Sequence, residues 1–170
     1  MSRFEELYSE YWRDVFKFLF RLTGYQQELS EELAQETFYQ AILSFHRYRG
    51  ECQIKTWLCQ IAKNLYFNTI RRHKKVRQVS FEENDDLAAL IIDSVAADYE
   101  TKELINNANK VIMRLDDKTR DVLIYRIFSE LTYAQISALL KISESSAKVI
   151  FMRGKCKLQN ELREEYGYEI

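Results

Sequence analysis

The complete absence of proline is the feature that most restricts what this chain can fold into. Its 170 residues include no proline and only four glycines. Both residue types favour turns and end helices, while the chain is rich in helix formers such as Leu, Ile, Ala, Glu, Lys and Gln. Hydrophobic residues make up 46% and charged residues 30%, which allows a packed core and disfavours wholesale disorder. We therefore expect an all-α protein.

Apolar residues recur at helical spacing in two groups of segments. The first group covers residues 3–23, 27–48 and 54–75, and the second begins near Lys102 and continues over 117–129, 132–140 and 143–164. The stripe expected to be buried on the helix over 27–48 comprises Leu29, Leu33, Thr37, Ala41 and Phe45, widened by Phe38 and Ile42. The corresponding stripe on the helix over 54–75 comprises Trp57, Leu58, Ile61, Leu65 and Ile70. The pattern predicts two small helical domains, 1–76 and 101–170, joined by a linker over 77–100.

Residues 131–153 carry the strongest local motif. Thr132 fits the N-cap of a capping box that Gln135 completes, and a short helix follows. Lys141 then begins a tight turn, after which Ser143 can cap the next helix. Two short helices joined in this way form a helix-turn-helix. The alternative is a helical hairpin that merely packs and has a basic outer face.

The second helix of such a motif enters the major groove, with its N-terminal half facing base edges. We assign Lys148, Val149 and Met152 to base contacts, Arg153 to bases or phosphate, and Lys155 to the DNA backbone. Two serines at the start of the helix complete the set. The candidate residues are Ser145, Ser146, Lys148, Val149, Met152, Arg153 and Lys155.

Charge is strongly partitioned along the chain, although the net charge is only -1. Residues 25–45 contain four glutamates and no Lys or Arg, residues 46–78 contain nine Lys or Arg and one Glu, and residues 79–100 contain seven acidic residues and no basic one. Separate acidic and basic blocks are typical of a nucleic-acid binder that also has acidic contact surfaces. A solvated helix face produces similar runs.

Aromatic residues are interleaved with the cations of the basic block, a combination that suits single-stranded or melted nucleic acid. These aromatic residues are Phe45, Tyr48, Trp57, Tyr66 and Phe67. We expect Trp57 to be buried beside Leu58 and Ile61. Asn64 and Asn68 lie one turn apart and either contact base edges or form polar surface.

Several function classes find no support in the sequence. The three cysteines form no CxxC pair, the two histidines lack metal-ligand spacing, and no glycine-rich phosphate loop or nucleophile–base pair is present. No apolar run approaches the roughly 18 residues that span a membrane, and the acidic N-terminus is unlike a signal peptide. We expect a cytoplasmic protein without catalytic activity, metal, cofactor or stable membrane insertion.

Three segments in this order resemble a bacterial RNA polymerase sigma factor of the extracytoplasmic-function group. They are Glu31–Phe38, Phe45–Arg72 and Leu131–Ile136 with the helix that follows. The resemblance implies a protein that binds core RNA polymerase and directs promoter-specific transcription initiation. Residues 1–76 would be its region 2-like domain and residues 101–170 its region 4-like domain. An anti-sigma factor is a further partner that the resemblance implies.

The resemblance also implies roles for individual residues. Four residues would dock on the beta-prime clamp of the polymerase, while the beta flap would be a second contact: Glu31, Glu32, Gln35 and Glu36. A second set would bind the minus-ten element, with the loop 48–54 holding a flipped base: Tyr48, Arg49, Gly50, Lys55, Asn64, Arg71 and Arg72. The helix after the turn would read the minus-thirty-five element. The acidic linker would enter the active-site and RNA-exit channels.

Three positions depart from the family's pattern. Asp116 stands where many members have proline, Glu130 where many have glycine, and Ile150 where many have a second basic residue. Since a non-glycine residue in a left-handed conformation costs about 1–2 kcal/mol, we expect the turn before Thr132 to be shaped differently. A stand-alone helix-turn-helix regulator, which would bind duplex DNA without polymerase and as a dimer, is the main rival reading.

Overall fold

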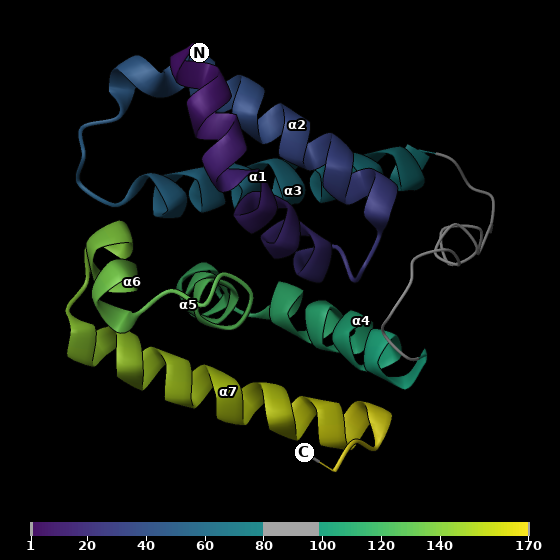
Figure 1. Cartoon of the computed structure of the whole chain (residues 1–170). Coiled ribbons are helices and arrows are strands. Elements are labelled where there is room, and N and C mark those ends of the chain that lie inside the picture. Colours follow the sequence, from purple (N-terminus) through teal and green to yellow (C-terminus); the bar gives the residue numbers. More distant parts are fainter. Residues whose placement is uncertain (1, 80–98, 170) are drawn as a thin grey trace. The chain divides into compact units, whose positions relative to one another are not determined.

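The structure, a computed structural model, describes residues 2–79 and 99–169. These residues form seven α-helices and one 3₁₀ turn, with no strand among them (Figure 1). The expectation of an all-α protein is confirmed. The chain separates into two compact units, one built on α1–α3 and the other on α4–α7. The acidic linker predicted over 77–100 falls almost entirely outside the described residues.

The N-terminal unit begins with two packed helices, α1 (Arg3–Leu22) and α2 (Gln27–Ser44), followed by the 3₁₀ turn η1 (Phe45–Arg47). A capping box starts α1: Glu5 N–H donates to Ser2 Oγ (3.3 Å), and Ser2 N–H donates to Glu5 Oε2 (2.7 Å). Phe18 of α1 and Phe38 of α2 are among the largest fully buried side chains of the protein. The helix predicted over 27–48 therefore tightens into η1 in its last turn.

The buried face of α2 matches the predicted stripe only in part, because Leu29 and Phe45 are half-buried and Ile42 is exposed. Its buried residues are Ser30, Leu33, Ala34, Thr37, Phe38 and Ala41. Ile42, predicted to widen this stripe, is 45% exposed. The buried hydroxyls are satisfied within the unit, because Ser30 Oγ lies 2.8 Å from Thr23 Oγ1 and Thr37 Oγ1 donates to Leu33 O (2.6 Å).

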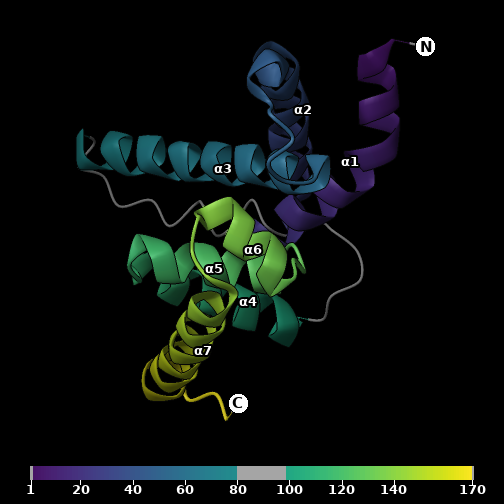
Figure 2. The same cartoon turned by 90° about the vertical axis from the view of Figure 1, so that its left-hand side faces the viewer.

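The third helix, α3 (Ile54–Val79), runs crosswise to α1 and α2 (Figure 2). Of the predicted buried stripe, only Leu58 is fully buried, and the other four residues are half-buried. The core is instead formed by Leu58, Cys59, Ala62, Tyr66 and Phe67. The prediction was wrong because Cys59 and Ala62 allow close packing, so the helix turns these small residues and the two aromatic rings inward.

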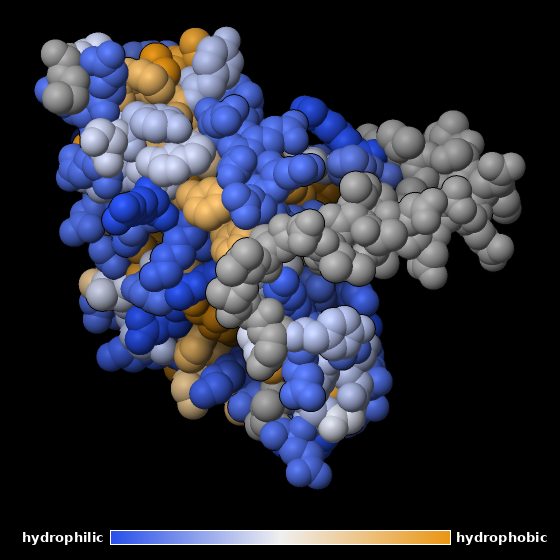
Figure 3. Space-filling model, turned by 45° about the vertical axis from the view of Figure 1, so that its right-hand side comes forward, coloured by the Kyte–Doolittle hydropathy of each residue, from blue (hydrophilic) through white to orange (hydrophobic). Residues whose placement is uncertain are grey.

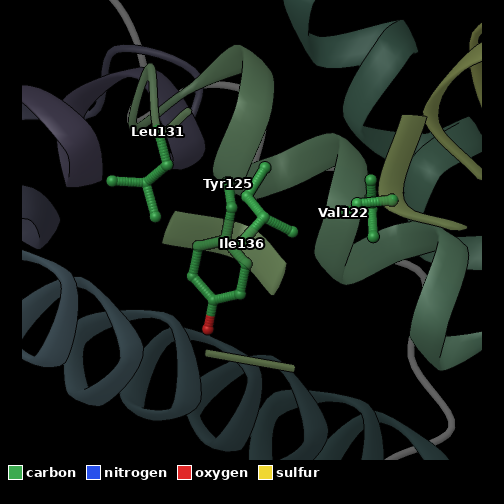
Figure 4. Close-up of a cluster of buried hydrophobic side chains, with 5 residues drawn as sticks. Val122, Tyr125, Leu131 and Ile136 are labelled. Atoms are coloured by element: carbon green, nitrogen blue, oxygen red, sulfur yellow. The ribbon is translucent and has the colours of Figure 1, made fainter. Parts of the chain in front are cut away.

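The C-terminal unit contains α4 (Tyr99–Arg114), α5 (Asp117–Ile127), α6 (Tyr133–Leu140) and α7 (Glu144–Tyr166). The long helix α7 packs against the other three (Figure 1). A core cluster joins α5, α6 and α7, and four of its members are labelled in Figure 4. Its buried residues are Val122, Tyr125, Leu131, Ile136 and Ala147. The predicted helix-turn-helix is therefore present as a packed unit.

The turns of the C-terminal unit explain two departures from the family's pattern. Asp116 accepts a hydrogen bond from Thr119 N–H (3.0 Å) and so caps α5 at the place of a proline. Glu130 adopts φ +56°, a left-handed conformation that glycine adopts readily. Glu130 therefore carries the strain of a left-handed conformation, and the expectation of a differently shaped turn before Thr132 stays a prediction. Lys141 also adopts a left-handed conformation, at φ +54°, where α6 ends.

A glycine allows α5 and α7 to approach closely. Gly154 is buried on α7, and a Cβ atom at this position would lie 2.6 Å from Thr119 Cγ2 and 3.3 Å from Leu123 Cδ1. Farther along α7, Arg114 of α4 forms ion pairs with Glu165 (2.9 Å) and Glu161 (3.5 Å). These contacts hold α7 in place, so that its first turns can present side chains to a partner.

Candidate polymerase and promoter interfaces

The four candidate polymerase-binding residues lie on the face of α2 that is opposite its buried side. Glu32 and Gln35 are exposed, and Glu31 and Glu36 are half-buried. Two of the carboxylates are held by glutamine amides one turn away: Gln27 Nε2 donates to Glu31 Oε1 (2.9 Å) and Gln40 Nε2 to Glu36 Oε1 (2.8 Å). Since α2 contains no Lys or Arg, no cation of the helix itself neutralises these carboxylates.

The acidic face of α2 continues into an apolar patch that sequence reasoning missed. Tyr39, Ile42 and Leu43 are 55%, 45% and 53% exposed. They follow Gln35 and Glu36 at three- to four-residue spacing and therefore share one face of the helix with them. Hydrophobic residues also interrupt the hydrophilic surface in the upper part of Figure 3, which belongs to the N-terminal unit. The spacing was visible in the sequence, but Ile42 was assigned to the buried side.

Three aromatic rings meet where η1 leads into the loop before α3. The ring centroids of Phe45 and Tyr48 lie 5.9 Å apart, those of Phe45 and Trp57 5.9 Å, and those of Tyr48 and Trp57 5.1 Å. The Arg3 guanidinium lies over the Phe45 ring at 4.4 Å. We call Phe45, Tyr48 and Trp57 the aromatic triad. All three residues are half-buried, so the expectation of a buried Trp57 was wrong.

The other two aromatic residues of the basic block belong to the core. Tyr66 and Phe67 are 8% and 5% exposed, and burial raises the pKa of the Tyr66 hydroxyl to about 12. In these buried positions, neither ring is accessible for stacking on a base. Lys63, one of the nine cations, is likewise only 7% exposed. The alternation of aromatic and basic residues therefore overestimated the surface that is available to nucleic acid.

The candidate minus-ten residues form an elongated track. Arg49, Gly50, Asn64, Arg71 and Arg72 are exposed, and Tyr48 and Lys55 are half-buried. Tyr48, Arg49 and Gly50 lie in the loop and Lys55 in the first turn of α3, whereas the other three lie farther along the helix. At 1.5 Å per residue, Lys55 and Arg71 are about 24 Å apart along α3. A track of this length suits an extended nucleic-acid strand better than a ligand that fills a single pocket.

All seven candidate minus-thirty-five residues on α7 are exposed. Val149 and Met152 are 46% and 56% exposed, while Ala147, Gly154 and Leu158 are buried on the opposite side. Ser143 caps the helix by accepting from Ser146 N–H (3.1 Å), and its hydroxyl also contacts those of Ser145 (3.2 Å) and Ser146 (2.8 Å). The serine hydroxyls are thus partly engaged at the helix start.

Ile150 stands on α7 at the position where the family's pattern has a second basic residue. Its side chain is half-buried and packs against the core cluster of the helix-turn-helix. Next to it, Lys148 and Val149 are exposed. In this chain the position therefore faces inward, and a basic residue here would have to leave the core to reach DNA.

Two kinds of feature are absent from the described residues. Among the residues that the structure describes, no group of three or more His, Cys, Asp or Glu side chains could hold a metal ion. No helix in the described part of the chain is both long and apolar enough to cross a membrane.

Comparisons with known proteins identify both units. The family Sigma-70 region 2 matches residues 7–76, and the family Sigma-70, region 4 matches residues 106–158. The ECF RNA polymerase sigma factor SigM of Bacillus subtilis (strain 168) is 32% identical over 91% of this chain and 92% of its own length. The RNA polymerase sigma factor YlaC of the same organism is 30% identical over 93% of this chain and 91% of its own length.

Two solved structures share the fold. The sigma factor RpoE from Bartonella quintana, in complex with the anti-sigma factor NepR, has a TM-score of 0.62 at 21% identity and matches 97% of this chain and 99% of its own. CnrH, in complex with the cytosolic domain of CnrY, has a TM-score of 0.61 at 15% identity and matches 95% and 88% of the two chains. Sigma factors as a class are not enzymes. This chain belongs to the extracytoplasmic-function sigma factors, which bind bacterial core RNA polymerase and direct promoter-specific transcription initiation.

Proposed function

We propose that α2 binds the polymerase, that the aromatic triad and α3 bind the melted minus-ten element, and that α7 reads the minus-thirty-five element. The observation that carries this division is the separation of an acidic and apolar face on α2 from cationic faces on α3 and α7. Residues 1–76 and 101–170 would be the two functional domains and 77–100 the acidic linker. The family matches over 7–76 and 106–158 support these boundaries.

The polymerase site would combine electrostatic steering with apolar burial. Glu31, Glu32, Gln35 and Glu36 would face the basic coiled coil of the beta-prime clamp, where opposite charges speed association. Tyr39, Ile42 and Leu43 would form the apolar part of the same contact, and burying apolar surface contributes about 25 cal/mol per Å². The C-terminal unit would contact the beta flap.

The minus-ten site would offset the cost of base extrusion by stacking. Extrusion costs a few kcal/mol, and stacking one base on an aromatic ring contributes about 1–3 kcal/mol. The aromatic triad provides half-exposed rings beside the loop that carries Arg49 and Gly50. Lys55, Asn64, Arg71 and Arg72 would then follow the strand along α3.

An anti-sigma factor is a further proposed partner. Support comes from the RpoE structure, in which the sigma factor is bound to the anti-sigma factor NepR. Such a protein would hold this chain away from the polymerase in the cytoplasm, where transcription takes place.

Charge reversal on α2 tests the division of labour. Glu32→Lys with Glu36→Lys should lower co-purification with core polymerase at least about tenfold, since two attractive pairs become repulsive, and should abolish run-off transcription from a genomic promoter pool. Glu6→Lys with Glu10→Lys is the matched control, because these exposed glutamates have the same spacing on α1. Unchanged co-purification of the α2 variant would remove α2 from the polymerase interface.

A further inference from the structure

Two cations lie against one aromatic ring in the helix-turn-helix. The Arg126 guanidinium is 4.8 Å from the centroid of the Tyr133 ring, and Lys148 Nζ is 5.9 Å from the same centroid. Phe151 meets the Tyr133 ring edge-on at 6.0 Å. Arg126 belongs to the last turn of α5, Tyr133 is the first residue of α6, and Lys148 lies early in α7. The cluster thus joins α5, α6 and α7.

Within the described residues, the two cations of this cluster have no acidic partner. Neither Arg126 nor Lys148 forms an ion pair there with a carboxylate, and Glu144, one turn before Lys148, is not paired with it. Arg126 Nη1 donates to Leu131 O (2.9 Å), which fixes the guanidinium but uses only one of its five N–H donors. The ring attracts both cations and leaves their charges intact. Such a cluster favours an anion.

The start of α6 adds a second set of donors at the same place. In the capping box, Gln135 N–H donates to Thr132 Oγ1 (3.2 Å) and Thr132 N–H donates to Gln135 Oε1 (2.8 Å). The N–H groups of Tyr133 and Ala134 take no part in the box, and they point out of the positive end of the helix. Helix N-termini bind phosphate through such groups. The phenol hydroxyl of Tyr133 is one more donor.

We propose that Arg126, Tyr133 and Lys148 bind one backbone phosphate of the minus-thirty-five DNA. In a helix-turn-helix the first helix crosses the sugar–phosphate backbone while the second enters the major groove, which places the start of α6 against a phosphate. A phosphodiester carries one negative charge and two free oxygens, which suits two cations on different helices. Lys148 then contacts the backbone rather than a base, and base reading falls to Val149, Met152 and Arg153. This inference rests on the proposed role of α7.

Neutral phosphates in the promoter provide the test. Single methylphosphonates, which remove one backbone charge each, are placed in turn across the minus-thirty-five element, and holoenzyme affinity is measured with wild-type protein and with Arg126→Gln. At one position the substitution should weaken wild-type binding about tenfold, as expected for a lost charge-assisted contact. Arg126→Gln should lower the affinity for unmodified DNA by a similar factor. The methylphosphonate at that same position should then lower the affinity of the variant little further. Lys148→Gln should show the same coupling.

The controls separate this site from the rest of the interface. Lys155→Gln removes another exposed cation of α7. Its effect on affinity should add to that of the methylphosphonate at the position that is coupled to Arg126. The phosphate site would be overturned if the effects of Arg126→Gln and of Lys148→Gln each added fully to that of the methylphosphonate at every position. If Arg153→Ala still weakens binding in that case, the role of α7 stands without it. If neither Arg153→Ala nor Met152→Ala changes minus-thirty-five-dependent binding, the proposed function of α7 itself fails. Because one arm modifies only DNA, a folding defect cannot mimic the coupling.

Discussion

At the residue scale, the turn between α6 and α7 depends on a lysine in a conformation that side chains rarely adopt. Lys141 has φ +54°, and Ile142 N–H donates to Ser137 O (3.2 Å), the bond that closes a Schellman-type helix end. Ile142 then packs against the core cluster. The sequence placed the turn correctly, but a lysine gives no signal of a left-handed residue. The conformation follows from closing the helix and burying Ile142 together.

Replacing this lysine with glycine should stabilise the C-terminal unit. The left-handed conformation costs a non-glycine residue about 1–2 kcal/mol, but glycine loses more backbone entropy on folding. We therefore expect the free energy of unfolding of Lys141→Gly to exceed that of Lys141→Ala by about 1 kcal/mol. Urea unfolding followed by circular dichroism measures this difference. Tryptophan fluorescence is unsuitable, because both tryptophans lie in the N-terminal unit. Lys141→Ala is the control for loss of the charge. Equal stability of the two variants would mean that the turn is not strained.

Asp116 makes the stability of α5 depend on pH. Hydrogen bonds from the backbone N–H and the side chain of Thr119 lower the pKa of its carboxyl below the ordinary value of 3.8. A carboxyl group whose pKa is lowered by folding stabilises the folded state at pH values above its unfolded-state pKa. This stabilisation is lost as the pH falls through the folded-state pKa. Wild type should therefore lose stability relative to Asp116→Asn below pH 3.8. Urea titrations at pH 7 and pH 3 compare them, and a constant difference would contradict the assignment.

At the element scale, the approach of α5 to α7 is decided by a contact of one methyl group. Gly154→Ala would bring a Cβ atom 2.6 Å from Thr119 Cγ2, and overpacking of this kind costs about 1–3 kcal/mol. The helix propensity of alanine offsets part of that cost. Thr119→Ser removes the methyl group and keeps a hydroxyl. In a double-mutant cycle on urea unfolding, Gly154→Ala should be less destabilising, or even stabilising, in the Thr119→Ser background. Strict additivity would show that the helices separate instead.

The faces of α2 and α3 show the limits of periodicity at this scale. A stripe of apolar residues predicts that one side of a helix is buried, but its edges depend on neighbouring helices. Ile42 lies at such an edge and is exposed, and so it joins the proposed polymerase site instead of the core. On α3, Tyr66 and Phe67 entered the core although their cationic neighbours suggested a nucleic-acid surface. The packing of each helix within the folded unit decided both outcomes.

For the whole molecule, salt dependence reports how many phosphates the two DNA-binding surfaces contact. Each contact contributes about -0.9 to the slope of log affinity against log salt, so about five contacts predict a slope near -4 to -5 from this subunit. Lys155→Gln should make the holoenzyme slope less steep by about 0.9, and Lys110→Gln, an exposed cation on α4, should leave it unchanged. Promoter affinities of holoenzyme between low and moderate salt provide the measurement. An unchanged slope for Lys155→Gln would exclude it as a phosphate contact.

Sequence patterns alone were enough to predict the helical class, the places of the helices and the helix-turn-helix. These follow from local causes, namely the lack of proline, the 3.6-residue period and caps such as Thr132 and Ser143, which act within a few residues. The sequence also indicated the exposed face of α7, because a helix buried on one side must present the other. The folded arrangement of the helices was needed to show which rings remain on the surface, that Ile150 faces inward, and that Arg126, Tyr133 and Lys148 meet. These residues are brought together by packing between helices, which depends on shape and volume and not on any short-range pattern.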